Sequence, residues 1–340
     1  MALAEMAQET QGAGTGGQEP KVGLVLGAGG LVGLAHHAGT LAALENDLRW
    51  DPRTADVIVG SSAGSVIGTL LRSGISACDL AAWCASASDD PLLAQVRKME
   101  EELPPFGVSG LFRRWSVPGV AFWRQVLHNT RSLRFPPFSS LLPSGQLATS
   151  DYRAQMQRIL GEDWPKGLWL CATQRETGSR TVFGRPGSPR VPLSEAVAAS
   201  CAIPTYFQPV LIDGTEYVDG GMRSSTNADL LLGRDLDVAI VVAPLSTNDP
   251  RSREWAAPLR LWVHHHVKRE VAALRTAGIP VVLFEPGDVV RHEMGLDPMG
   301  RGRADRVMRE SFFEAGRLIS NEAIRKVIRP FLPGVRHTKS

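Results

Sequence analysis

The residue of this sequence whose setting most readily supports chemistry is Ser62, in Gly60-Ser61-Ser62-Ala63-Gly64. The apolar run at 57–59 predicts a short strand before it, and the apolar segment after it predicts a helix. Strand, sharp turn and helix are the setting of a nucleophile elbow. Gly60 and Gly64 let strand and helix approach closely, and the helix N-terminus favours an oxyanion beside Ser62. The alternative is an ordinary glycine- and serine-rich turn.

A serine nucleophile needs a base within hydrogen-bonding reach, and the usual base is a histidine backed by a carboxylate. The histidines of this chain favour structural or surface roles instead. Three of them are consecutive on a predicted helix and therefore point in different directions, and the last lies in a polar tail. The candidates are His36, His37, His128, His264, His265, His266, His292 and His337.

Asp219 is a different candidate base. It ends a predicted strand and precedes Gly220 and Gly221, which allow the chain to bend around the carboxylate. A carboxylate beside a serine hydroxyl can accept its proton if desolvation raises the carboxyl pKa. An Asp-Gly pair is also a common turn, and spacing alone leaves both interpretations open.

A second glycine-rich loop, Gly27-Ala28-Gly29-Gly30-Leu31-Val32-Gly33, lies between a predicted strand at 22–26 and a predicted helix at 34–48. Such a loop can hold a dinucleotide pyrophosphate, offer N–H groups to a reaction oxyanion, or be a tight turn without a ligand. The dinucleotide fingerprint fits poorly, because Val32 occupies its third glycine position. The acidic residue that binds the ribose would have to be Glu45 or Asp47, and both come too early in the chain. Adjacent parallel strands would bring this loop and Ser62 to one sheet edge, which favours the oxyanion role.

The order of predicted elements indicates an α/β protein with a mostly parallel sheet covered by helices. Strands are expected at 22–26, 57–59, 169–173, 180–183, 236–243 and 280–284, with a hairpin at 210–221 that turns at Asp213-Gly214. Helices are expected at 34–48, 152–160, 193–200, from 227 to 232, at 259–277 and at 305–328.

We expect one domain over residues 21–340, preceded by a disordered tail at 1–20. Residues 85–150 lose periodicity and contain many prolines, which predicts an inserted lid or cap. Cationic and aromatic side chains are mixed within 110–138, which suits either peripheral contact with a membrane or inward packing of the cap.

Composition restricts the class of protein. The net charge of +2 argues against a nucleic-acid partner. Four cysteines in 340 residues, without metal-type spacing, favour reduced thiols in the cytoplasm, and Cys201 is expected to be a small buried apolar residue. We see neither a signal peptide nor a transmembrane run. Oligomeric state cannot be inferred from these features.

Four motifs in register resemble those of the patatin-like phospholipase family. They are the glycine loop with His36 and Gly39, the Ser62 motif, Ala199-Ser200-Cys201-Ala202-Ile203-Pro204 with Phe207 and Pro209, and Tyr217-Val218-Asp219-Gly220-Gly221 with Asn227. The resemblance covers residues 21–245 and implies a three-layer α/β/α fold that hydrolyses acyl esters of lipids. It assigns Ser62 as nucleophile, Asp219 as base and the amides of Gly29 and Gly30 as oxyanion hole. The supporting glycines are Gly27, Gly33, Gly60, Gly64, Gly220 and Gly221.

The resemblance implies no metal and no organic cofactor. Two positions depart from the family pattern: Ala28 stands where glycine is usual, and Val32 where a cation is usual. Ala28 is tolerated if its φ is negative, and loss of the cation puts a phospholipid headgroup preference in question. An acyltransferase or thioesterase would use the same dyad, and a non-hydrolytic nucleotide-binding protein is the remote alternative.

Overall fold

The computed structural model describes residues 20–104, 139, 142, 144–160, 163–247, 257–300 and 302–328. Within them eight strands form one sheet in the order β5-β6-β3-β2-β1-β7-β8, and β4 pairs with β3. The strands are β1 Val22–Leu26, β2 Val57–Ser61, β3 Leu168–Gln174, β4 Arg180–Phe183, β5 Val210–Ile212, β6 Thr215–Asp219, β7 Val238–Val242 and β8 Val281–Phe284.

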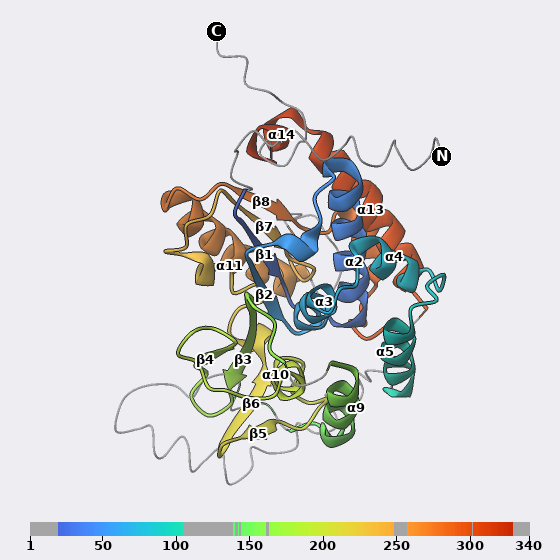
Figure 1. The fold of residues 1–340 in the computed structure, drawn as a ribbon, viewed down its shortest axis with the longest axis vertical. Coiled ribbons are helices and arrows are strands. Elements are labelled where there is room, and N and C mark those ends of the chain that lie inside the picture. Colours follow the sequence, from blue (N-terminus) through green and yellow to red (C-terminus); the bar gives the residue numbers. More distant parts are fainter. Residues whose placement is uncertain are drawn as a thin grey trace, which may run out of the picture.

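Helices cover both faces of this sheet. They are α2 Gly30–Leu48, α3 Ala63–Arg72, α4 Ala77–Cys84, α5 Pro91–Glu102, α9 Ser150–Leu160, α10 Leu193–Ser200, α11 Ala257–Thr276, α12 Asp288–Met294, α13 Ala304–Ser320 and α14 Glu322–Ile328. The short 3₁₀ helices are η1 Pro52–Thr54, η2 Gly220–Met222 and η3 Ala228–Leu231. In Figure 1, α11 lies on the opposite side of the strands from α2, α3 and α13.

Two hydrophobic clusters explain this three-layer arrangement. Side chains of a strand alternate between its faces, so Leu24 and Leu26 of β1 join a core beneath α2, α3, α10 and α13, whereas Val25 joins a core beneath α11 and η3. The strands that carry both cores are buried along their whole length, as central parallel strands are. The expected three-layer α/β/α fold with a mostly parallel sheet is confirmed.

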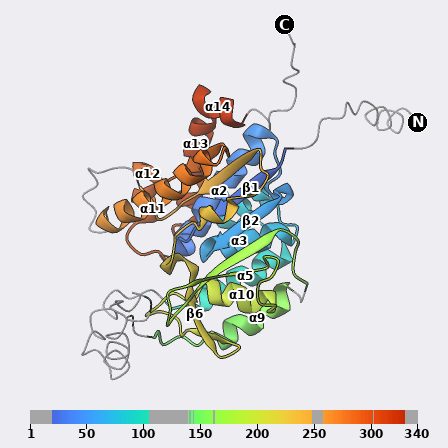
Figure 2. The same ribbon diagram turned by 90° about the vertical axis from the view of Figure 1, so that its left-hand side faces the viewer.

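Strand β3 joins the parallel and antiparallel parts of the sheet. It runs parallel to β2, with Ser61 opposite Cys171, and antiparallel to β6, with Asp219 opposite Ala172. Strand β4 pairs with these positions of β3 along one edge of β3. Strands β2 and β6 therefore both lie along its opposite edge. The carboxyl ends of β2 and β6 therefore meet head to head. In Figure 2 the strands follow one another down the molecule from β1 through β2 to β6.

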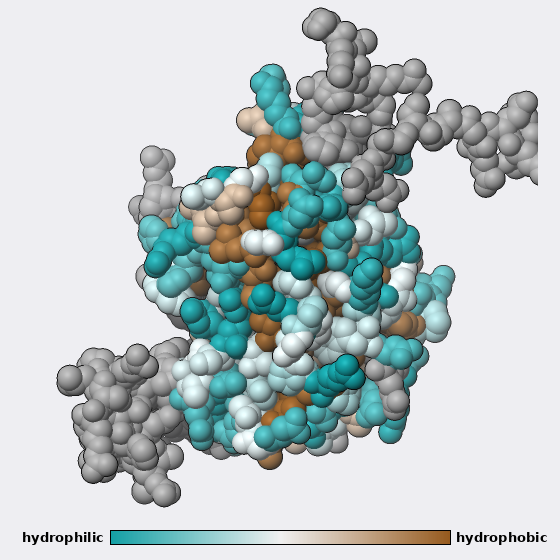
Figure 3. All heavy atoms as spheres, turned by 60° about the vertical axis from the view of Figure 1, so that its left-hand side comes forward, coloured by the Kyte–Doolittle hydropathy of each residue, from teal (hydrophilic) through white to brown (hydrophobic). Residues whose placement is uncertain are grey.

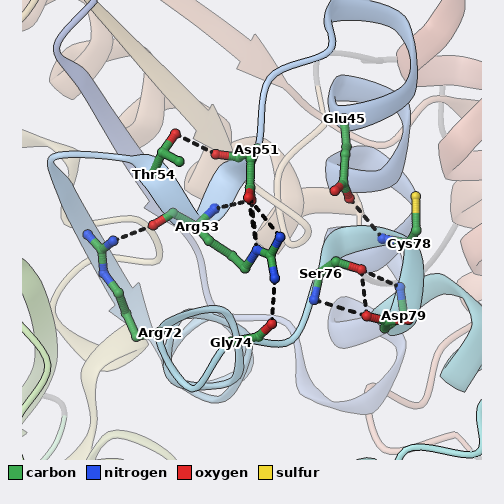
Figure 4. Close-up of polar contacts among 9 residues, drawn as sticks. All are labelled: Glu45, Asp51, Arg53, Thr54, Arg72, Gly74, Ser76, Cys78 and Asp79. Atoms are coloured by element: carbon green, nitrogen blue, oxygen red, sulfur yellow. Dashed lines mark hydrogen bonds and ion pairs between the residues drawn. The ribbon is translucent and has the colours of Figure 1, made fainter. Parts of the chain in front are cut away.

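A polar network fixes the C-terminal end of α3, the helix that follows Ser62. Figure 4 shows Arg53 held by the Asp51 carboxylate and donating from Nη1 to the Gly74 carbonyl at 2.6 Å, while Arg72 donates to the Arg53 carbonyl at 2.6 Å. Ser76 and Asp79 form a capping box that starts α4. These contacts connect the segment before β2 to the C-terminal end of α3. They therefore hold together the two elements that flank the elbow.

Three expected elements differ from the observed ones, and one helix appears where none was expected. Helix α2 begins at Gly30, inside the glycine loop, and the helix expected from 227 to 232 is only the 3₁₀ turn η3. The long final helix breaks at Asn321, which takes an extended conformation and caps α14 by accepting from the Ala323 N–H at 2.9 Å. Helix α5 was not expected, because its proline was interpreted as a breaker; Pro91 instead occupies the first turn, after an Asp90 N-cap.

The described surface is mixed in polarity. In Figure 3 apolar side chains gather in a narrow band in the upper half of the face, between hydrophilic margins. None of the described helices combines the length and hydropathy needed to cross a bilayer. The expected tail at 1–20 lies outside the described residues except for Pro20, and so does most of the expected lid, including its aromatic-cationic stretch at 110–138.

Candidate active site

Ser62 lies on a strained turn between β2 and α3. It is the N-cap of α3, with φ 52° and ψ −120°, a conformation that side-chain-bearing residues rarely adopt. The approach of α3 to the sheet makes glycine necessary at position 64, where a Cβ would lie 1.9 Å from the carbonyl oxygen of Leu26 in β1. The Ser62 N–H donates to Ser200 Oγ at 3.0 Å. The geometry is that of a nucleophile elbow.

Asp219 meets this serine because of the register of β3. Residues 171 and 172 face Ser61 and Asp219, which brings the Ser62 side chain close enough to the Asp219 carboxylate to lower the carboxyl pKa. The chain turns at once after Asp219, where Gly220 is required because a Cβ there would lie 2.2 Å from the Cys171 carbonyl oxygen. The two residues are thus brought together by strand pairing and by a turn that only glycine permits.

The Asp219 carboxyl is 6% exposed, and burial raises its pKa to about 6. Hydrogen bonds from Ser62 and from the Gly221 N–H, the latter at 2.7 Å, oppose this rise because they stabilise the ionised form. Desolvation outweighs them. A carboxylate of this basicity is ionised at neutral pH yet is a stronger proton acceptor than an ordinary aspartate.

The glycine loop lies beside the elbow, and its amides divide into two sets. Those of Gly27, Ala28, Val32 and Gly33 donate to protein carbonyls at 2.7–3.2 Å. In the described part of the chain, those of Gly29, Gly30 and Leu31, at the N-terminus of α2, have no protein acceptor, and neither does that of Ala63 after Ser62. Gly30, Ser62 and Ala63 line one pocket. Free N–H groups of two helix N-termini therefore lie near the serine, as an anion site requires.

This pocket is apolar apart from the serine and two neighbours. Helices α5 and α9 close one side of it with Val96, Met99 and Met156. Its polar members besides Ser62 are Glu100 and Cys201. An elongated apolar group attached to a polar, reacting end matches this lining.

The described histidines do not provide a base for Ser62. His36 and His37 are buried, and desolvation lowers their pKa values to about 3 and about 4, so both are neutral. His36 Nδ1 contacts Ser311 Oγ and His37 Nε2 contacts the Gly27 carbonyl, each at 2.8 Å, so His37 supports the glycine loop. His264 pairs with Glu285 at 2.6 Å. His128 and His337 lie outside the described residues.

Three residues of the site were not singled out by sequence reasoning as contributors. Cys201 is half-buried rather than a buried apolar residue, and its Sγ lies 3.4 Å from the Ser62 carbonyl oxygen. Ser200 Oγ accepts a hydrogen bond from the Ser62 N–H, and Asn227 Nδ2 donates one to Ser61 Oγ at 2.8 Å. All three belong to the motifs quoted above, and this membership was the sequence signal that could have identified them. The φ of Ala28 is not positive, so this departure from the family pattern causes no strain.

Comparison with known proteins agrees with this geometry. The profile of the patatin-like phospholipase family matches residues 24–232. Lysophospholipase nte1 of Aspergillus fumigatus is 24% identical over 235 residues, which are 68% of this chain and 12% of the fungal protein. An uncharacterised NTE family protein of Mycobacterium bovis is 26% identical over 230 residues, 67% of this chain and 50% of that protein. The matched region is therefore at most half the length of these relatives.

Solved structures with similar folds have low sequence identity. VipD from Legionella pneumophila aligns with a TM-score of 0.43 at 13% identity, over 89% of this chain and 67% of VipD. Human GIVD cytosolic phospholipase A2 aligns with a TM-score of 0.43 at 11% identity, over 96% of this chain and 65% of that structure. The fold and the elbow define an α/β protein with a serine at the carboxyl end of a central strand. The family profile is more specific, and the chain belongs to the patatin-like phospholipase family.

Proposed function

We propose that this protein is a serine-dependent lipid acyl hydrolase that uses a Ser62–Asp219 dyad. The observation that carries the proposal is a strained, buried serine beside a buried carboxylate whose pKa is raised by burial. Ser62 lines an apolar pocket. Family membership and the lysophospholipase relative support the same class of reaction.

In the proposed mechanism Asp219 takes the proton of the Ser62 hydroxyl as Oγ attacks the ester carbonyl. The tetrahedral oxyanion accepts hydrogen bonds from the amides of Gly29 and Gly30, which have no acceptor in the described structure. Collapse expels the alcohol, which receives the proton from Asp219, and leaves an acyl-enzyme. Asp219 then deprotonates a water that attacks this ester and releases the fatty acid.

The glycine loop is better suited to an oxyanion than to a dinucleotide pyrophosphate. A Cβ at Gly29 would lie 2.8 Å from Pro244, and one at Gly30 would lie 2.4 Å from the Pro298 carbonyl oxygen, so protein covers part of the loop closely. A pyrophosphate needs several free amides together with space for two phosphates. This crowding favours the single oxygen of a tetrahedral intermediate.

The pocket supports a substrate with an acyl chain. Its lining by α5 and α9 would hold a hydrocarbon chain beside Ser62. Val32, which replaces the family's usual cation, is 4% exposed and belongs to the core beneath α2, so it offers nothing to a phosphate. We therefore propose recognition mainly through the acyl chain. Peripheral membrane contact through 110–138 stays a prediction.

The dyad predicts the dependence of activity on pH. Asp219 must be ionised to accept the serine proton, and its pKa is raised to about 6. We expect kcat/KM to rise about tenfold per pH unit below pH 6 and to level off above it. A profile measured with a neutral ester such as p-nitrophenyl butyrate tests this. An acid limb near pH 4 would mean that the base is an ordinary, solvated carboxylate.

The reaction class can be tested by measuring fatty acid release from lysophosphatidylcholine, from phosphatidylcholine vesicles and from p-nitrophenyl esters, with Ser62→Ala as blank. We expect release from at least one substrate that requires Ser62. Added glycerol, as a competing acceptor, separates hydrolysis from acyl transfer because a transferase would form the new ester. Absence of serine-dependent release from all of these substrates would contradict the proposal.

A further inference from the structure

One carboxylate on the far side of the sheet holds the segment that follows the proposed base. Glu270 of α11 accepts three hydrogen bonds from residues 224–228: from Ser224 Oγ at 2.5 Å, from Thr226 Oγ1 at 2.6 Å and from the Ala228 N–H at 2.8 Å. Charge-assisted hydrogen bonds of this length are among the strong ones in proteins. Ser224 and Thr226 are nearly or fully buried. The segment is thus fastened to α11 through both carboxylate oxygens.

The fastened segment contacts the glycine loop and Ser61, and it follows Asp219 closely in the chain. It begins five residues after Asp219. The Ser225 carbonyl accepts from the Ala28 N–H at 2.7 Å, which fixes the glycine loop next to its free amides. Asn227 Nδ2 donates to Ser61 Oγ at 2.8 Å, directly before the nucleophile. A shift of this segment would therefore move base, oxyanion loop and nucleophile relative to one another.

The segment needs an external support because its own conformation is unfavourable. Asn227 is left-handed, with φ 57°, and is fully buried. Ser224 Oγ accepts from the Asn227 N–H at 2.9 Å while donating to Glu270, so the turn and the carboxylate are linked through one hydroxyl. Loss of the Glu270 acceptor frees that hydroxyl to rotate and removes the partner of the buried Thr226 hydroxyl.

We propose that Glu270 is a positioning residue. It holds segment 224–228, and through this segment the glycine loop and Ser61, in a fixed position relative to Asp219. The proposal rests on the function proposed above. Displacements of about 1 Å at a reacting centre can cost about a hundredfold in rate. The residues that line the apolar pocket come from neither this segment nor α11. We therefore expect loss of Glu270 to lower kcat and to leave KM nearly unchanged.

The test compares Glu270→Ala, Glu270→Gln and Thr226→Val with a matched control, Glu314→Ala. Glu314 is also a half-buried helical glutamate that accepts a loop amide, from Gly287 at 2.7 Å, but it lies on α13 away from the site. We expect Glu270→Ala to lower kcat for p-nitrophenyl butyrate about 10- to 100-fold with KM within about twofold. Glu270→Gln, which keeps one carbonyl acceptor, should recover part of the rate. Glu314→Ala should lower Tm without lowering kcat.

A double-mutant cycle and hydrogen exchange complete the test. The effects of Glu270→Ala and Thr226→Val on kcat should be less than additive, because both variants break the same contact. Amide exchange in Glu270→Ala should rise at 224–228 and also at 27–33. Exchange that rises only at 224–228, or a kcat that falls no more than in Glu314→Ala, would overturn the proposal. If the wild type hydrolyses no ester, the proposed function fails, whereas exchange at 27–33 still decides whether Glu270 holds the glycine loop.

Discussion

Replacing Ser62 with alanine should abolish ester hydrolysis while leaving the fold intact. Removal of the hydroxyl eliminates the nucleophile, and the expected loss in kcat is on the order of 10³-fold or more. Alanine at φ 52° carries the same backbone strain as serine, so thermal stability should change little. Glycine at this position should relieve the strain and raise stability by about 1 kcal/mol.

Activity and thermal unfolding measured on the same preparations of Ser62→Ala and Ser62→Gly provide the check. Both variants should be inactive, and only the glycine variant should unfold at a higher temperature. Hydrolysis by a pure Ser62→Ala preparation at a tenth of the wild-type rate or more would exclude Ser62 as the nucleophile. A wild-type stability above that of Ser62→Gly would mean that the turn is not strained.

Replacing Asp219 with asparagine should also abolish hydrolysis, but it should make the protein more stable. The native carboxyl pKa is raised to about 6 from an ordinary 3.8, so ionisation at neutral pH is unfavourable in the folded state. The unfolded state therefore releases its proton more readily, and wild-type stability falls as pH rises from about 4 to about 6. Asparagine does not ionise, and the expected gain above pH 6 is on the order of 2–3 kcal/mol.

The pH dependence separates this effect from a change in packing. The difference in free energy of unfolding between Asp219→Asn and wild type should be small at pH 4, grow to pH 6 and stay constant above it. Denaturant titrations at pH 4, 5, 6 and 8 measure it. A variant that is inactive and also less stable at every pH would contradict the desolvation argument.

Local sequence signals predict much of the scaffold. The apolar runs of β1, β2 and β7, the Asp213-Gly214 turn of the hairpin and the motif around Ser62 each have a short-range physical cause, and the structure contains all of them. The pairing of Ser62 with Asp219 has no short-range cause. It depends on the register of β3, whose residues 171 and 172 face the two strand ends. Spacing left two interpretations of Asp219 open, and only the family resemblance chose between them.

Other features of the site depend on tertiary contacts that the sequence does not display. Helix α5 itself was missed because Pro91 was taken to interrupt structure, although a proline after an Asp N-cap also starts helices. Glu270 lies in an amphipathic helix where an acidic residue is ordinarily solvated. Its three contacts form only when α11 packs against η3.

Labelling with a fluorophosphonate is a direct test of an activated Ser62–Asp219 dyad. In that reaction Ser62 Oγ forms a bond to phosphorus, fluoride leaves, and Asp219 accepts the serine proton. Intact mass and peptide mapping of wild type and Asp219→Asn, with and without lipid vesicles, give the result. We expect a single phosphonyl adduct on Ser62 in the wild type and none in Asp219→Asn over the same interval. Absence of an adduct from the wild type, or equal labelling of the two proteins, would contradict the proposed dyad.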